Sequence, residues 1–122
     1  MIRVVPVGLL FLTPAPFLSP ADETNTMTPE DFVSQYESAL AAQSWDKVAP
    51  LIHENCTVTF SNGSSHRGKE QVREAFQRNF DLIEDEKYSL SDLHWIVKDD
   101  NIAVFTYSYH WSGTISGEPA SG

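Results

Sequence analysis

The segment from Gln35 to Phe76 constrains the fold of this chain more than any other, because regular elements follow each other with almost no residues left for loops. It reads QYESALAAQSWDKVAPLIHENCTVTFSNGSSHRGKEQVREAF. The pattern predicts the end of one helix, a second short helix, a strand, a tight hairpin and the start of a third helix. Few folds use this order, so the segment constrains the architecture well and the chemistry poorly.

Apolar residues at helical spacing predict three helices. The first begins after Thr28, with Pro29 as its first residue and Asp31 placed to complete a capping box. The second begins near Trp45, and the third covers Lys69 to Ile83. The residues expected to face inward are Phe32, Val33, Tyr36, Ala39, Leu40, Trp45, Val48, Ala49, Ile52, Val72, Ala75, Phe76, Phe80 and Ile83.

β-branched and aromatic residues predict two hairpins. Thr57–Phe60 and Ser65–Arg67 flank an Asn-Gly dipeptide, which is typical of tight reversals. Tyr88–Val97 and Ile102–Ile115 flank the polar turn Lys98–Asn101 and form a longer hairpin.

The last of these strands has two different faces, because successive side chains of a strand point to opposite sides. One face carries Phe105, Tyr107, Tyr109 and Trp111, and the other carries Val104, Thr106, Ser108 and His110. We expect both faces to be buried, one against the helices and one against another subunit or sheet.

Composition indicates one acidic globular domain. The chain has 122 residues, 41% of them hydrophobic, and its 8 Lys and Arg against 17 Asp and Glu give a formal net charge of −9. Such a balance opposes binding to nucleic acid or to an anionic membrane, so neither partner is expected. Cys56 is the single cysteine, which excludes an internal disulfide and a thiolate metal cage. The four histidines lack the spacing of a helical metal site, and we expect no metal and no cofactor.

Residues 1–27 differ from the rest and are expected to lie outside the domain. Arg3, the apolar run Val4–Leu12 and the small residues Ser19–Ala21 have the order of a secretory signal, although four prolines interrupt that segment. Alternatively, Met27 is the true start. The first interpretation predicts an exported protein and the second a cytoplasmic one.

The order helix, helix, strand, strand, helix, strand, strand resembles the nuclear transport factor 2-like superfamily. Two short segments share this resemblance. They are the Ala-Ala-Gln-Ser-Trp-Asp junction that ends at Asp46 and the His66–Glu70 segment that leads into the third helix. Within it, the chain looks most similar to SnoaL-like and ketosteroid-isomerase-like small proteins. The resemblance covers residues 28–117 and implies an α+β cone, with a bent antiparallel sheet wrapped around three helices and a mostly apolar pocket at the wide end. Many members dimerise through the sheet, which implies a homodimer.

The resemblance also gives candidate site residues. Tyr36 lies where ketosteroid isomerases carry an oxyanion-hole tyrosine, and the alternative is a core tyrosine with a polar partner for its hydroxyl. The general-base aspartate of those enzymes aligns with Phe60, which cannot accept a proton, so steroid isomerisation by that mechanism is not expected. His110, on the polar strand face, is the candidate general base, and a subunit contact is its alternative role. The candidate ligand-binding residues are Tyr36, Phe60, Trp95, Tyr107 and Trp111.

The end of the chain predicts an incomplete domain over residues 28–122. Ser116–Pro119 has turn composition, and relatives in the superfamily continue from such a turn into further strands. We therefore expect a fragment, or a form that depends on dimerisation or strand exchange, in which the strand Ile102–Ile115 has an open edge.

Two functional classes follow. The first is a SnoaL-like pocket protein that binds a small apolar or polycyclic molecule, or transforms it by cofactor-free acid–base chemistry such as isomerisation, cyclisation or dehydration. The second is a non-catalytic accessory domain that dimerises and binds a peptide or partner subunit. The sequence leaves open whether the chain is an enzyme, because one fold hosts both classes.

Overall fold

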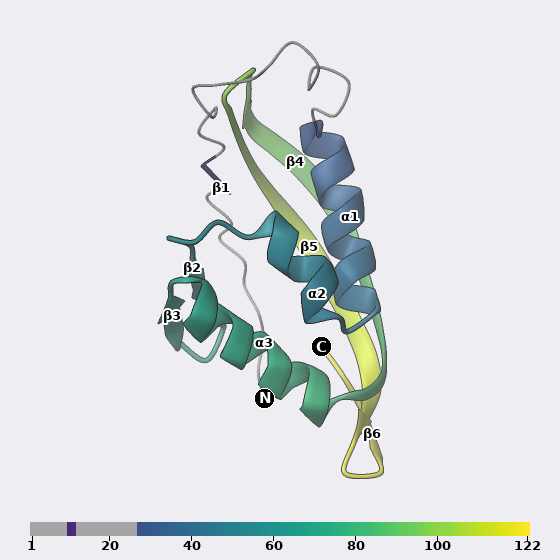
Figure 1. Cartoon of the computed structure of the whole chain (residues 1–122). Coiled ribbons are helices and arrows are strands. Elements are labelled where there is room, and N and C mark those ends of the chain that lie inside the picture. The colour runs from purple at the N-terminus through teal and green to yellow at the C-terminus, as the bar shows by residue number, and fades with distance from the viewer. Residues whose placement is uncertain (1–9, 12–26) are drawn as a thin grey trace.

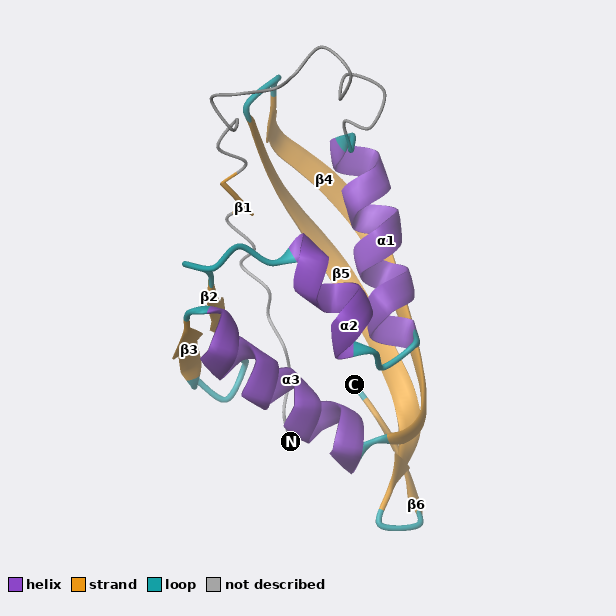
Figure 2. Cartoon of the chain, viewed as in Figure 1, coloured by secondary structure: helices purple, strands orange, loops and turns teal. Residues whose placement is uncertain are grey.

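The computed structural model describes residues 10–11 and 27–122, which form an α+β fold with the predicted order of elements (Figures 1 and 2). The elements are β1 (Leu10–Phe11), α1 (Pro29–Ala41), α2 (Trp45–Val48), the 3-10 helix η2 (Ala49–Leu51), β2 (Thr57–Thr59), β3 (Ser65–Arg67), α3 (Lys69–Leu82), β4 (Glu84–Lys98), β5 (Ile102–Ile115) and β6 (Glu118–Ser121). The predicted helices and strands are thus confirmed, with β4 beginning four residues earlier than expected.

The strands form two antiparallel sheets. β2 and β3 make a small hairpin beside α3, while β4 and β5 make the long ribbon that dominates Figure 1. β6 pairs with the end of β5, and β1 pairs with its beginning, both on the edge opposite β4. Among the described residues the larger sheet stays open and closes no barrel.

The long ribbon is bent because β4 carries irregular pairing at three places. The register to β5 shifts between Glu84 and Lys87, between Ser91 and His94, and between Trp95 and Val97. Asp85 and Asp92, inside the first two shifts, have φ angles of 53° and 52°. Extra residues of this kind bend a strand and increase its twist. The bent sheet expected from the sequence is therefore confirmed, and its curvature lets it follow the helices.

The start of α1 forms as the local sequence predicts. The Asp31 amide donates to Thr28 Oγ1 at 3.1 Å, and the Thr28 amide donates to Asp31 Oδ2 at 3.2 Å. Pro29 stands at the first helical position, where its missing N–H costs no hydrogen bond. This capping box fixes where α1 begins and hence which of its faces meets the sheet.

The core lies where the three helices meet the aromatic face of β5. Its buried residues are Phe32, Val33, Tyr36, Ala39, Leu40, Val48, Leu51, Val72 and Phe76, with Phe105, Tyr88 and Trp95 of the ribbon packed against them. One face of β5 was expected to lie against the helices, and the structure shows that it is the aromatic face. The opposite face, with Thr106, Ser108 and His110, is exposed in the single chain.

The expectation of an open edge on β5 changes in part. Only the turn Ser116–Gly117 separates β5 from β6, and β6 pairs with Ser112–Ile115, so the expected open edge of β5 is shorter than predicted. β1 pairs with Ile102 and Ala103 at the other end of that edge. The remaining residues of the segment 1–27, including the signal-like features, lie outside the described residues, apart from Met27 at the foot of α1.

Candidate functional site

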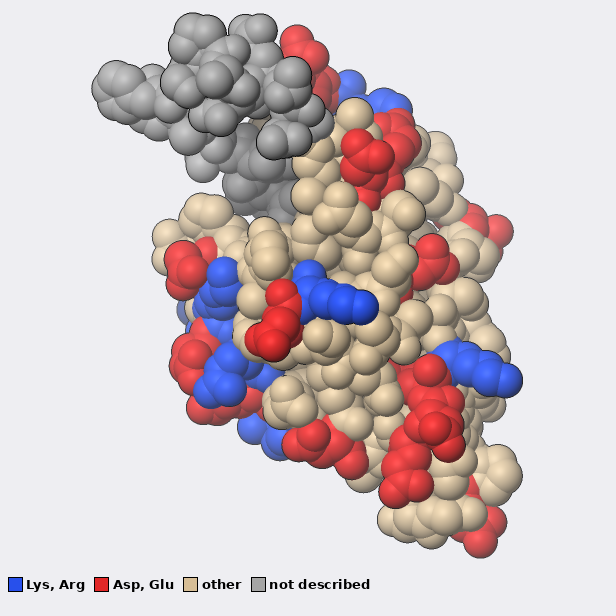
Figure 3. Space-filling model, turned by 45° about the vertical axis from the view of Figure 1, so that its right-hand side comes forward, with Lys and Arg blue, Asp and Glu red and all other residues tan. Residues whose placement is uncertain are grey.

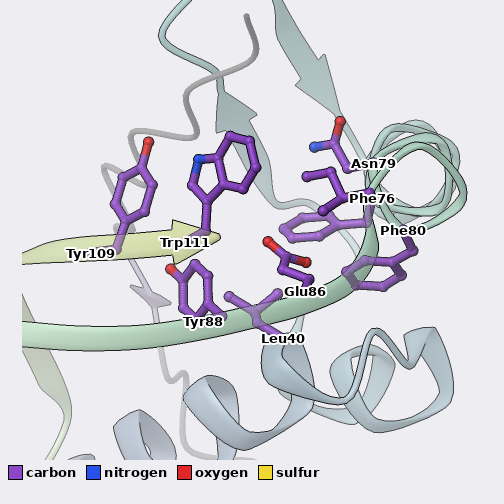
Figure 4. Close-up of a pocket in the computed structure, with 9 residues that line it drawn as sticks. Leu40, Phe76, Asn79, Phe80, Glu86, Tyr88, Tyr109 and Trp111 are labelled. Atoms are coloured by element: carbon purple, nitrogen blue, oxygen red, sulfur yellow. The ribbon is translucent and has the colours of Figure 1, made fainter. Parts of the chain in front are cut away.

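A pocket opens between the C-terminal half of α3 and the aromatic face of the ribbon (Figure 4). Its lining residues come from α1, α3, β4 and β5 and are Leu40, Phe76, Asn79, Phe80, Ile83, Glu86, Tyr88, Tyr109 and Trp111. The cavity volume is about 40 Å³, within about 470 Å³ of empty space that includes solvent at the open mouth. Mostly apolar walls with a few polar groups are the usual composition of a small-molecule site.

The first register shift of β4 places Glu86 in this pocket. Asp85 and Glu86 together oppose Gly113 of β5, because Glu84 pairs with Thr114 and Lys87 with Ser112. Such bulges commonly direct a side chain toward a functional site. Figure 4 shows the Glu86 carboxylate pointing into the space between Trp111 and Phe76.

Gly113 gives the bulge the space it needs. A Cβ atom on Gly113 would lie 2.6 Å from Ile83 Cγ2 and 2.8 Å from the Glu84 carbonyl oxygen. Real Cβ atoms essentially never come that close to other heavy atoms, so this position requires glycine while the bulge keeps its shape.

Gln43 joins the pocket to the end of α3. Its Nε2 amide donates to the Ile83 carbonyl at 2.7 Å, to Glu86 Oε2 at 3.3 Å and to the Phe80 carbonyl at 3.4 Å. The last carbonyls of a helix lack partners within the helix, and a side-chain donor supplies them here. One side chain from the α1–α2 junction thus orders both the helix end and the Glu86 carboxylate.

Burial raises the pKa of the Glu86 carboxyl above its ordinary value of 4.5, and the hydrogen bond from Gln43 opposes this shift without cancelling it. Apolar surroundings disfavour the charged form of a carboxyl group. Within the described part of the chain, no Lys, Arg or His side chain forms an ion pair with Glu86, in contrast to Glu30, Glu54 and Glu70. Glu86 is therefore the titratable carboxyl that the pocket perturbs.

Three phenols, Tyr36, Tyr88 and Tyr107, lie near one another, and Tyr88 also lines the pocket. The hydroxyl oxygens of Tyr88 and Tyr107 are buried, and neither has a hydrogen-bond partner in the described chain, although the two phenols are close enough to influence each other. Burial raises the pKa of Tyr36, Tyr88 and Tyr107, so all three stay protonated at neutral pH. A buried hydroxyl without a partner is a place for an ordered water or a polar ligand atom.

The site residues predicted from the sequence do not meet in one place. Trp111 lines the pocket, whereas Tyr107 does not, although its buried hydroxyl lies near that of the lining residue Tyr88. Trp95 packs on Phe105 with ring centroids 5.0 Å apart, toward the far end of the ribbon. Trp111 is thus the one predicted ligand-binding residue that borders the described pocket.

Tyr36, Phe60 and His110 have other surroundings. Tyr36 stacks on Phe32 within the core, with ring centroids 5.8 Å apart. Phe60 is buried against Phe76, with centroids 6.2 Å apart. His110 is exposed on the outer sheet face and pairs in register with Ser89. Acid–base catalysis by Tyr36 and His110 at the pocket therefore stays a prediction that the geometry of the single chain does not favour.

Sequence reasoning missed Glu86 and Gln43. Glu86 lies before the predicted start of its strand, and Gln43 lies at a predicted break between helices. One signal was present, since Glu86, Tyr88 and Leu90 alternate with Lys87 and Ser89 in the manner of a half-buried strand. That alternation, extended backward, places the carboxylate of Glu86 on the same face as Tyr88.

Surface charge agrees with the acidic composition. On the face shown in Figure 3, acidic side chains are dispersed from one end of the molecule to the other, with basic ones among them. In the described ranges no three His, Cys, Asp or Glu side chains gather closely enough to hold a metal ion. No helix of the described chain has the length and apolarity needed to cross a membrane.

Comparison with protein families matches residues 33–122 to the SnoaL-like domain. The chain therefore belongs to the SnoaL-like domain family, which is part of the nuclear transport factor 2-like superfamily. No curated protein and no solved structure matched the chain. Membership suggests a ligand-binding or isomerase-type protein and leaves the ligand undefined.

Proposed function

We propose that this chain binds a small, mostly apolar molecule with one polar group in the pocket between α3 and the ribbon. The observation that carries the proposal is the convergence of Phe76, Phe80 and Trp111 on a single carboxylate, Glu86. Apolar walls supply affinity by removing surface from water, and one well-placed polar group fixes the orientation of the ligand.

The size of the cavity narrows the ligand class. A water molecule needs about 10–15 Å³, so a cavity of about 40 Å³ holds roughly three waters. This space suits a head group or part of one ring, with the rest of the ligand at the open mouth. A polycyclic ligand, which the family resemblance suggested, would enter only if Phe80 or another wall side chain moved.

Filling the pocket from α3 is expected to abolish binding of a single-ring probe. Asn79 lines the pocket, so Asn79→Trp places an indole in its space, whereas the exposed neighbour Arg78 offers a matched control in Arg78→Trp. Benzyl alcohol at 100 times its Kd should raise the unfolding free energy of the natural chain and of Arg78→Trp by about 2.7 kcal/mol. Thermal unfolding and saturation-transfer NMR measure this effect.

Two outcomes would count against the pocket. Equal binding of benzyl alcohol to Asn79→Trp and to the natural chain would place the probe elsewhere. Absence of saturable binding by benzyl alcohol and by a wider set of single-ring probes would remove the proposed function.

We also propose that the exposed sheet face forms a homodimer, the contact that the sequence suggested. The helices cover one face of the ribbon, while the other bears His110 and the exposed Val97, which pairs in register with Val104, and Leu93 and Ile96 of the same strand are exposed as well. Ile96 is 57% exposed, and clustered apolar side chains on a sheet face commonly mark an interface.

A charge on that face is expected to separate the two copies. Ile96→Glu should change the mass measured by light scattering from that of a dimer to that of a monomer, because an unpaired carboxylate would be buried in the contact. Gln35→Glu makes the same change of charge on the exposed side of α1 and should leave the dimer intact. A natural chain that is already monomeric at high concentration would refute the proposal.

A further inference from the structure

Glu86 is a partly buried carboxylate that lines the pocket and has no cationic partner among the described residues. Glu30, Glu54 and Glu70 pair with Lys98, Lys69 and Arg73, whereas Glu86 receives a hydrogen bond only from the neutral amide of Gln43. That bond uses Oε2, and Oε1 makes no hydrogen bond within the described residues. The carboxylate thus keeps one oxygen available on the side of the pocket.

The walls around this carboxylate are mainly aromatic. Phe76 and Phe80 have ring centroids 6.0 Å apart on α3, and Tyr88 and Tyr109 stack with centroids 5.9 Å apart on the ribbon. Trp111 completes the lining from β5. Aromatic rings attract cations through their quadrupole, and tryptophan does so most strongly.

We propose that the ligand of this pocket is a small organic cation, an alkylammonium or arylalkylammonium group that pairs with Glu86 and lies against the aromatic walls. This inference rests on the proposed function, because it names the polar group of the ligand in the same pocket. An ammonium N–H donates to Glu86 Oε1, and its carbon substituents occupy the apolar space that leads to the mouth.

Three observations favour a cation over a neutral or anionic ligand. A carboxylate without a cationic partner gains most from a ligand that supplies the missing charge, since charged hydrogen bonds are stronger than neutral ones. The net charge of −9 repels anions and attracts cations at a distance. The chain also makes such a contact internally, because Lys98 Nζ lies 5.0 Å from the ring centroid of Trp95.

The small cavity fits the same ligand class. A charged head group of a few atoms fits the cavity volume of about 40 Å³, and the apolar remainder would lie at the open mouth. The titratable groups that face this space are Glu86 and the phenols of Tyr88 and Tyr109, with Asn79 and Gln43 as neutral amides. Acidification therefore acts on the binding site through Glu86.

The test compares benzylammonium with benzyl alcohol, which have similar shapes and differ in charge. Isothermal titration at pH 7.5 is expected to show about tenfold tighter binding of benzylammonium to the natural chain. Glu86→Gln should remove that preference and leave benzyl alcohol within about twofold of its original affinity. Glu84→Gln makes the same change of net charge at an exposed position of β4 and should keep the preference.

A pH series separates pairing with Glu86 from general attraction. Burial raises the pKa of Glu86 above 4.5. As the pH is lowered, the carboxylate should therefore begin to take up its proton, and the affinity for benzylammonium should begin to fall, while the pH is still above 4.5. The affinity for benzyl alcohol should not change over the same range. Equal affinities for the two probes, or a preference that survives Glu86→Gln, would overturn the inference while the pocket itself stands. Failure of both probes to bind would overturn the inference and count against the proposed function as well.

Discussion

Alanine at position 113 is expected to destabilise the fold by about 1–3 kcal/mol, the usual cost of forcing extra atoms into a packed site. The new Cβ would meet Ile83 Cγ2 at 2.6 Å and the Glu84 carbonyl oxygen at 2.8 Å. The side chain of Ile83 is buried and the carbonyl belongs to the backbone of β4, so neither moves without disturbing its neighbours. The substitution therefore acts on the bulge that holds Glu86.

A pH-dependent measurement shows whether Glu86 moves. The folded state binds the Glu86 proton more tightly than the unfolded state, because folding raises the pKa of this carboxyl. The contribution of Glu86 to the free energy of unfolding has its full value below pH 4.5, and it declines as the pH rises through the raised pKa of the folded state. Urea unfolding across this pH range should show the decline in the unfolding free energy of the natural chain. In Gly113→Ala the decline should be smaller, because the substitution exposes the Glu86 carboxylate.

Gly117 provides the control for Gly113. Its φ angle is +82°, and a Cβ atom added to it would have no other heavy atom within 4 Å, so Gly117→Ala introduces backbone strain without a clash. We expect a cost of about 1–2 kcal/mol and an unchanged Glu86 titration. Natural stability in Gly113→Ala, with the Glu86 titration preserved, would show that the bulge adapts and that glycine is not required there.

The sequence predicted those parts of the fold that depend on local pattern. The capping box at Thr28 and Asp31 lies within four residues, so the start of α1 follows from local hydrogen bonding. The alternation from Phe105 to Trp111 follows from the geometry of one strand and separated an aromatic face from a mixed one, although it did not say which face packs on the helices.

The candidate site was less predictable because its residues meet only after folding. The run Glu84 to Lys87 has poor strand propensity, and its pairing with Ser112 and Thr114 overrides that preference. The bulge that directs Glu86 inward depends on a glycine far along the chain, which no local pattern connects to Asp85. The side chain of Gln43 likewise donates hydrogen bonds to residues that lie at least 37 positions away.

Family resemblance directed attention to a different part of the cone. It indicated Tyr36 as a polar anchor, and Tyr36 is instead packed among core residues. His110 was chosen from the polar face of β5, which points away from the helices. Both choices used residue type and alignment, whereas the pocket is defined by burial around Glu86. In this chain the aligned positions and the pocket therefore point to different residues.

Truncation of Phe76 is expected to have the largest effect on stability. Its side chain is 2% exposed and has three aromatic neighbours, with ring centroids 6.1 Å from Trp45, 6.2 Å from Phe60 and 6.0 Å from Phe80. Removing a buried phenyl ring costs about 3–5 kcal/mol, because burial is lost and a cavity remains. A domain of this size has about 5–15 kcal/mol in total, so Phe76→Ala should be close to unfolding at 37 °C.

Two further variants distinguish a packing effect from a ligand effect at Phe76. Phe76→Leu keeps most of the buried volume and should remain folded, with a smaller loss in urea unfolding. Phe80→Ala removes the same ring from a half-buried position on the next turn of α3. Because solvent replaces part of the lost contact there, its loss of unfolding free energy should be smaller than that of Phe76→Ala. Equal losses for Phe76→Ala and Phe80→Ala would contradict the assignment of Phe76 to the core.

Phe76 belongs both to the core and to the pocket wall. Phe76→Leu should therefore also weaken the binding of benzyl alcohol. The preference for benzylammonium depends on Glu86 and should remain.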